Sequence, residues 1–264
     1  MSLPREERLK ALGLWPVWRL REAGVGSATP LTEAIGTREA QSPGPLISQP
    51  AAQPTATPPP ARPSSPAAVV GHATTAGMDW DALRQAVSDC QACELAKSRI
   101  KPVFGVGDPN AEWLIIGEAP GADEDRQGEP FVGQAGKLLD AMLAAIGLRR
   151  GDNVYIANIL KSRPPGNRDP KSDEVSACLP YLERQIDLIR PRLILVLGRI
   201  AAQNLLRTDT AISRLRGQVH EYRGIPLVVT YHPAYLLRSL ADKAKSWEDL
   251  CLARDTLAAV KKSS

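Results

Sequence analysis

The sequence lacks the features that mark several large classes of protein. No apolar run approaches the roughly 20 residues that a membrane-spanning helix needs, and no apolar signal-peptide segment follows the first residues. Only four cysteines occur among the 264 residues, and no glycine repeat is present, which excludes a disulfide-stapled and a collagen-like protein. We therefore expect a cytoplasmic protein, of the bacterial cytosol or nucleoid, without a membrane partner.

An excess of charge of one sign is also missing. The net charge is +4, and residues 1–25 contribute half of it. Bulk charge therefore argues only weakly for nucleic acid, and any affinity for it must come from a local patch. Lys161, Arg163 and Arg168 form one candidate patch, for which a solvated loop is an equally good interpretation.

Aromatic residues are absent from residues 26–77, which contain ten prolines and only four charged side chains. Such a stretch cannot bury enough apolar surface to offset its ordering entropy, and we predict a disordered linker. Residues 1–25 before it include a Trp-Pro-Val-Trp cluster. We interpret residues 1–22 as a docking peptide for a protein partner, with a helix that packs back on the body as the alternative. Residues 78–264 are predicted to form one folded, monomeric domain.

Apolar strands alternate with helical segments in residues 78–264. Asp79 can cap a first helix that runs to Cys90. Continuous apolar stretches predict strands at 113–117, 154–159, 193–197 and 227–230, and the segments between them predict helices near 136–146, 173–189 and 200–206 and up to 260. This pattern is typical of a parallel sheet covered on both faces. We predict an α/β fold, a three-layer α/β/α sandwich around a four-stranded, mainly parallel sheet.

Polar residues follow three of these strands, at the sheet edge where α/β proteins bind ligands. The first strand leads into GEAPGADED at 117–125, Asn158 ends the second, and His232 follows the fourth. Taken singly, each is explained better as a capped loop, a turn residue or a strand-ending histidine. Their coincidence at three strand ends indicates a site instead. An amide beside an imidazole and carboxylates suits a planar heterocycle with adjacent carbonyl and N–H groups.

Three segments then carry a specific resemblance. They read GEAPGADEDRQGEPFVGQAGKLL from Gly117, NILKSRPPGNRDP from Asn158 and HPAYLLR from His232. In this order they are similar to the motifs of the family 4 uracil-DNA glycosylases, the iron–sulfur members of the uracil-DNA glycosylase superfamily, over about residues 85–255. The resemblance implies base excision repair, in which uracil is removed from single- or double-stranded DNA by hydrolysis of its N-glycosidic bond and an abasic site remains. It implies no nucleotide cofactor.

The resemblance also implies which residues contact the base. Phe131 resembles the aromatic residue that stacks on the flipped uracil, and Asn158 the amide that pairs with uracil and rejects cytosine. Gly117 and Ala119 are placed beside the same base. His232 resembles the imidazole that hydrogen-bonds uracil O2 while negative charge develops on the leaving base.

Two acidic positions of the first motif fall on Glu118 and Glu124. One of them is expected to orient or activate water and to stabilise the oxocarbenium-like sugar. We prefer Glu124 for the water and expect Glu118 to shape the pocket, against the 5-methyl group of thymine; the sequence leaves this division open.

Contacts to DNA outside the base follow from the same motifs. A base must leave the duplex before its glycosidic bond can be reached, so an apolar wedge is expected to fill the vacated stack. Leu236 and its neighbour Leu237 are candidates, with packing inside a helix as the alternative for one of them. The cations expected to hold flanking phosphates are Lys161, Arg163, Arg168 and Arg238.

The cysteines depart from the family pattern at one position. The family uses two close cysteines and two more about fifteen residues apart to ligate a [4Fe–4S] cluster. Cys90, Cys93 and Cys178 match three positions, but Ser162 stands at the remaining one. We expect a structural cluster with incomplete cysteine ligation. A zinc site of three cysteines and His220 is the alternative, and Cys251 is expected to be a packed thiol.

A second class of function stays open, namely a uracil- or damaged-DNA binding module without turnover. A related variant of the superfamily links covalently to the abasic sugar through a histidine in the loop after the second strand. Here that loop reads SRPPGNRDP and contains no histidine, which argues against cross-linking.

Overall fold

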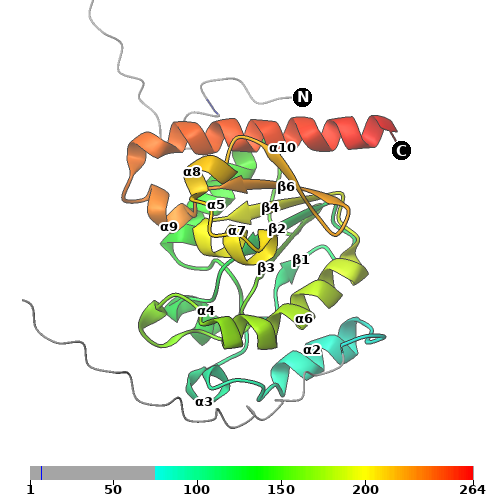
Figure 1. Ribbon diagram of the computed structural model, residues 1–264, viewed down its shortest axis with the longest axis vertical. Coiled ribbons are helices and arrows are strands. Elements are labelled where there is room, and N and C mark those ends of the chain that lie inside the picture. Colours follow the sequence, from blue (N-terminus) through cyan, green and yellow to red (C-terminus); the bar gives the residue numbers. More distant parts are fainter. Residues whose placement is uncertain (1–6, 8–74, 264) are drawn as a thin grey trace, which may run out of the picture. The chain divides into compact units, whose positions relative to one another are not determined.

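The computed structural model of the protein describes residue 7 and residues 75–263. The predicted docking peptide (1–25) and linker (26–77) lie almost wholly outside these described residues. Six strands of the described part form one sheet in the order β1-β3-β2-β4-β6-β5, seen edge-on among the helices in Figure 1.

The four predicted strands are confirmed and are mutually parallel. They are β2 (Trp113–Gly117), β3 (Val154–Asn158), β4 (Leu193–Leu197) and β6 (Ile225–Thr230). Two antiparallel edge strands, β1 (Val106–Gly107) and β5 (Val219–Tyr222), were not predicted. β1 has only two residues and β5 alternates exposed with half-buried positions, so neither shows the continuous apolar run by which the inner strands are found.

Helices cover both faces of the sheet, which confirms the three predicted layers (Figure 1). Every residue of β2, β3 and β4 is buried. Successive side chains point to opposite faces of the sheet, and helices cover both faces. One face packs against α6 (Ser172–Ile189) and α7 (Arg199–Leu206). The other packs against α5 (Gln134–Ala145) and α10 (Lys243–Ser263).

The first described helix, α2 (Trp80–Ser88), packs against α6, and its Trp80 ring also meets Tyr155 of β3 at a centroid distance of 5.3 Å. As predicted, Asp79 caps it, and its side chain accepts a hydrogen bond of 2.9 Å from the Ala82 N–H. Leu83 and Val87 are buried with Phe104 and Tyr181. The turn after α2 and the short α3 (Leu95–Ser98) thereby bring Cys90 and Cys93 toward α6.

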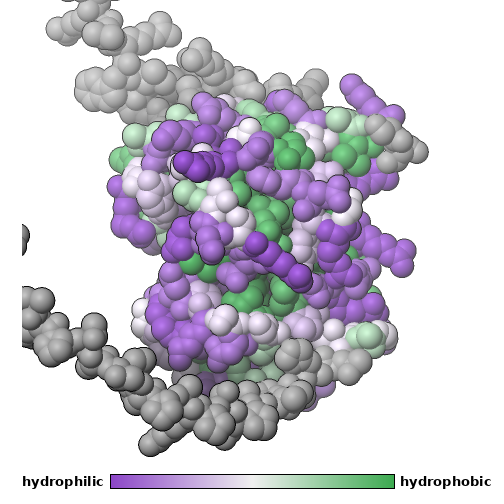
Figure 2. Space-filling model, viewed as in Figure 1, coloured by the Kyte–Doolittle hydropathy of each residue, from purple (hydrophilic) through white to green (hydrophobic). Residues whose placement is uncertain are grey.

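Short helices follow the carboxyl ends of the parallel strands. α4 (Ala122–Gln127) comes after β2, the 3-10 helix η1 (Pro165–Asn167) after β3, and α9 (Pro233–Leu236) after β6; the remaining short elements are α8 (Ile212–Leu215) and η2 (Leu240–Asp242). On the face drawn in Figure 2, hydrophilic side chains cover most of the surface and apolar ones gather in its middle. Among the described helices, none has the length and apolar character needed to cross a bilayer.

Candidate active site

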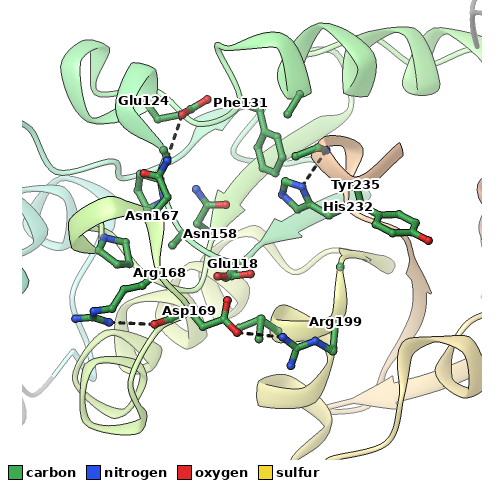
Figure 3. A pocket seen from close by; sticks show the side chains of 18 of the residues that line it. Glu118, Glu124, Phe131, Asn158, Asn167, Arg168, Asp169, Arg199, His232 and Tyr235 are labelled. Carbon is green, nitrogen blue, oxygen red and sulfur yellow. Dashed lines mark hydrogen bonds and ion pairs between the residues drawn. The ribbon is translucent and has the colours of Figure 1, made fainter. Parts of the chain in front are cut away.

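A cavity of about 640 Å³ lies where the carboxyl ends of β2, β3 and β6 meet. Its walls include the predicted site residues Glu118, Ala119, Glu124, Phe131, Asn158 and His232. Figure 3 shows Asn158 between Glu118 and Phe131, with His232 facing them from α9. The parallel strands therefore bring together side chains that are more than a hundred residues apart in the sequence.

Asn158 is the last residue of β3 and is 2% exposed. No donor among the described residues reaches its side-chain oxygen Oδ1, although that atom is buried. A buried carbonyl without a donor costs free energy, and such groups are rare in folded proteins. The amide thus presents an unused acceptor at the cavity wall.

Gly117 allows an aromatic ring to lie beside this amide. A Cβ atom at Gly117 would stand 2.3 Å from Asn158 Oδ1 and 2.6 Å from Phe131 Cζ, so only glycine fits between them. Phe131 itself has a left-handed backbone with φ of 55°, a conformation that costs a non-glycine residue about 1–3 kcal/mol. Its ring stacks toward the His232 ring, with the centroids 5.6 Å apart and the planes at 30°.

His232 is held as a neutral imidazole with a defined tautomer. It caps α9, and its Nδ1 accepts a hydrogen bond of 3.1 Å from the Ala234 N–H. Burial lowers the pKa of His232 to about 4, against the smaller opposing influence of Glu124. Because Nδ1 is an acceptor, the proton of the neutral ring lies on Nε2, which is a donor.

The carboxylate of Glu124 accepts three hydrogen bonds from backbone N–H groups. Its Oε1 accepts hydrogen bonds from the N–H groups of Val132 (3.0 Å) and Gly133 (3.2 Å), and its Oε2 accepts one from Gly121 (3.1 Å). These bonds fix the loop that carries Phe131 to the start of α4. A carboxylate has about four acceptor positions, so little of Glu124 is left for a water molecule.

Glu118 differs from Glu124 in the pKa of its carboxyl group. Burial, and then the nearby charge of Asp169, raise the pKa of Glu118 to about 7, and Arg199 acts in the opposite direction. Asp169 is ion-paired with Arg199 at 3.0 Å below Glu118 (Figure 3). A carboxyl group that titrates near neutrality is suited to proton transfer.

Two of the predicted DNA contacts are wrong. Lys161 is 2% exposed, and its Nζ donates to the Asn158 carbonyl (2.8 Å) and to Gln185 Oε1 (2.7 Å), so it cannot meet a phosphate. Burial also lowers the pKa of Lys161 to about 7. Leu236 is 1% exposed because it packs into the core under α9, whereas Leu237 is 44% exposed. Leu237 is therefore the leucine that could enter a base stack.

The other predicted cations lie at or near the cavity. Arg168 and Arg238 line it, and Arg168 is ion-paired with Glu174 of α6. Arg163 donates to Asn167 Oδ1 at 2.7 Å. Sequence reasoning missed Asn167, Asp169 and Arg199 as cavity residues. Arg199 follows the end of β4, so the rule that found the other three strand ends could have found it.

The cysteine region does not contribute to the cavity lining. Cys90 and Cys93 are half-buried, Cys178 is buried, and Ser162 is 3% exposed. Arg99 donates from Nη1 to Ser162 Oγ (3.0 Å) and from Nη2 to the Cys90 carbonyl (2.9 Å). Burial raises the pKa of Cys178 to about 11. Cys93 packs against the core cluster that contains Cys178, and Cys90 packs against the cluster that contains Tyr181 of the same helix, α6.

A single-metal site is not formed in the part of the chain that the structure describes. No three His, Cys, Asp or Glu side chains are arranged there around one ion. His220 lies on β5 with its Nε2 2.7 Å from the Leu215 carbonyl, which contradicts the Cys3His zinc alternative. Cys251 is half-buried on α10.

Comparison with known proteins identifies the family of this chain. The model of the uracil DNA glycosylase superfamily matches residues 104–251. The type-4 uracil-DNA glycosylase of Archaeoglobus fulgidus is 52% identical over 165 residues, which are 60% of this chain and 82% of the relative. That of Pyrobaculum aerophilum is 42% identical over 183 residues, 66% and 93% of the two chains. A type-5 uracil-DNA glycosylase of Thermus thermophilus is 35% identical over 155 residues, 50% and 68%. The chain belongs to the uracil-DNA glycosylase superfamily, as a type-4 member.

Proposed function

We propose that the protein is a DNA-repair glycosylase that takes uracil out of DNA by hydrolysing its N-glycosidic bond. The observation that carries this proposal is the buried, unpartnered Oδ1 of Asn158 beside the Phe131 ring and the neutral His232. The names of the relatives, type-4 uracil-DNA glycosylases, point the same way.

The amide of Asn158 can distinguish uracil from cytosine. Uracil presents an N3–H donor next to its O4 acceptor, and the amide offers an acceptor and a donor in the complementary order. Cytosine presents an acceptor and a 4-amino donor, so both contacts would be mismatched. Since Oδ1 is already buried, a mismatched base would leave polar groups unpaired, which is the strongest form of discrimination.

His232 is suited to stabilise the departing base. When the bond between the sugar C1′ and uracil N1 breaks, its electron pair stays with the base and the charge spreads to O2. The Nε2–H of a neutral imidazole can donate to that oxygen. A water molecule then adds to C1′ and loses a proton, and the released uracil is neutral after gaining one.

We propose that Glu118 activates the attacking water molecule, in place of Glu124, to which the sequence analysis assigns this role. All but one acceptor position of Glu124 serves the backbone of its own loop. Glu118 lines the same cavity, and its pKa of about 7 suits a general base at neutral pH.

Binding of the strand around the flipped base can use the rim of the cavity. We propose that Arg163, Arg168 and Arg238 hold flanking phosphates and that the exposed Leu237 fills the vacated stack. This assigns no base-specific contact outside the pocket.

We further propose that Cys90, Cys93 and Cys178 hold a [4Fe–4S] cluster. Cys90 and Cys93 both pack against clusters that include residues of α6, the helix of Cys178. Each ligand of such a cluster binds a different iron, so the three thiols need not meet at one point. Arg99 joins the Cys90 carbonyl to Ser162 and so holds two of the expected ligand positions together. Ser162 at the fourth position is a poorer ligand than a thiol. When bound, the cluster would supply a cross-link between the turn after α2 and α6.

We also propose that the protein acts as a cytoplasmic monomer and that residues 1–25 dock a protein partner through the linker 26–77. A chain that begins at Thr75 keeps the hydrogen bond of 3.2 Å from Thr75 Oγ1 to the Pro180 carbonyl. It should excise uracil from short oligonucleotides at the rate of the full chain.

The proposed activity is tested with two oligonucleotides that differ only by uracil or thymine at one position. Incubation with the protein followed by alkali should cleave the uracil strand alone. Retained binding to the uracil strand without cleavage would instead favour the non-catalytic binding module.

A further inference from the structure

The loop that carries Phe131 is held from two sides by groups of opposite charge. On one side, Glu124 Oε1 accepts the N–H groups of Val132 and Gly133. On the other side lies Arg150, in the turn between α5 and β3, which no motif in the sequence singles out. The peptide groups of the loop thus have their N–H ends toward an anion and their carbonyl ends toward a cation.

The Arg150 contacts are specific to a guanidinium group. Its Nη1 donates to the Pro130 carbonyl at 2.9 Å, and its Nη2 donates to the Phe131 carbonyl at 2.9 Å. Its Nε donates to Asp140 Oδ1 of α5 at 3.0 Å, so the fork is oriented by a carboxylate behind it. Only arginine has N–H donors in the planar arrangement that serves all three acceptors.

These bonds act where the backbone is strained. Phe131 has φ of 55°, and its carbonyl lies so close to α5 that a Cβ at Gly136 would stand 1.7 Å from the oxygen. A strained backbone persists only where its surroundings determine it. Relief of this φ needs either a turn of the peptide between Pro130 and Phe131 or a shift of the Phe131 Cα and its carbonyl. The first would take the Pro130 carbonyl away from Arg150, and the second would take the Phe131 carbonyl away from Arg150 and the ring from its place against Gly117 and His232.

We propose that Arg150 is a positioning residue, which holds the Phe131 ring in the cavity as a preformed face for the flipped base. The inference rests on the proposed function, because the ring is the surface on which uracil would stack. Arg150 does not line the cavity, and it therefore acts through Phe131. Misplacement of such a ring by about 1 Å can cost about a hundredfold in rate.

A double-mutant cycle between Arg150 and Phe131 tests the inference. Single-turnover uracil excision is measured for the full chain and for Arg150→Gln, Phe131→Ala and the double variant, with melting temperatures recorded in parallel. We expect Arg150→Gln to slow excision about ten- to a hundredfold in the parent, and less than about threefold once Phe131 is alanine. Equal losses in both backgrounds would overturn the proposal, because a general loss of structure does not depend on the ring.

The neighbouring arginine provides the matched control. The side chain of Arg149 is exposed and forms a 3.8 Å ion pair with Asp152, while the backbone contact between these two residues does not depend on the side chain, so Arg149→Gln should leave the rate unchanged. Where Arg150→Gln does not fold, Asp140→Asn removes only the support of the guanidinium and should give a smaller loss, again confined to chains with Phe131. If the parent excises no uracil, the proposed function fails, and the cycle is read from affinity for uracil-containing DNA instead.

Discussion

The cavity and the cysteine region lie at the two ends of one short segment, Asn158 to Ser162, and they differ in how many of their expected groups are present. At one end, Asn158 faces a cavity in which the amide, the imidazole, the aromatic ring and the carboxylates all occur. At the other end, a serine with an Arg99 hydrogen bond stands where the fourth thiol is expected.

The chain's own hydrogen bonds hold the segment between them. Lys161 Nζ joins the Asn158 carbonyl to Gln185 Oε1, and Gln185 Nε2 donates to the Phe104 carbonyl at 2.9 Å. Arg99 in turn ties Ser162 to the Cys90 carbonyl. The position of Asn158 therefore does not require a complete set of cluster ligands, and changes in the two regions should have separable effects.

The largest effect is expected from His232→Ala in the cavity. Loss of the single donor to the departing base should slow uracil release about 10²–10³-fold, while affinity for the abasic product changes less. Single-turnover excision and product binding measure the two quantities. His220→Ala is the matched control on β5 and should be close to the parent. Equal losses of rate and product affinity would mean that His232 only holds structure.

A smaller effect is expected from changing the charges beside Glu118. If Glu118 must be ionised to activate water, excision should fall as the pH drops through about 7, the pKa to which burial and Asp169 raise that carboxyl group. Asp169→Asn removes a like charge, so the pKa of Glu118 falls and the acid limb of the pH–rate profile moves to lower pH. Arg199→Gln removes a cation and should move the limb to higher pH. Asp209→Asn, at an exposed position after α7, is the control. If the acid limb does not move in either variant, Glu118 is not the group that activates the water.

The smallest effect on catalysis is expected in the cysteine region. Ser162→Cys supplies the fourth thiol and should raise iron and sulfide per chain and the melting temperature, with an excision rate close to that of the parent. Iron and sulfide are measured in the parent and in both variants after purification without air. The control is Ser162→Ala, which removes the Arg99 contact without adding a thiol. A parent without iron would contradict the cluster, and equal gains in stability in both variants would contradict the role of the thiol.

Sequence alone predicts the inner part of this fold because all the signals there are local. β2, β3, β4 and β6 are continuous apolar runs, and the polar residues after three of them meet at one edge of any parallel sheet. The edge strands β1 and β5 have no such run, because one is two residues long and the other is partly exposed.

The wrong assignments concern residues whose direction only tertiary packing decides. Lys161 and Arg163 are two residues apart in one motif, yet the first is buried against Gln185 and the second lies near the surface with Asn167. Leu236 and Leu237 are adjacent, and α9 turns one inward and the other outward. Arg150 lies outside every motif, because its contacts are to backbone carbonyls that no side-chain pattern marks.

The central claim is that the buried amide of Asn158 reads the base. Its most direct test is the ratio of uracil to cytosine excision, measured under single-turnover conditions for the parent and for Asn158→Asp on strands that differ only at the target base. A protonated carboxyl group can donate to cytosine N3 and accept from its 4-amino group, whereas the amide is complementary to uracil. We predict that the variant loses uracil excision and that the ratio shifts toward cytosine. Excision of uracil by Asn158→Asp at the parental rate, with an unchanged ratio, would contradict the assignment.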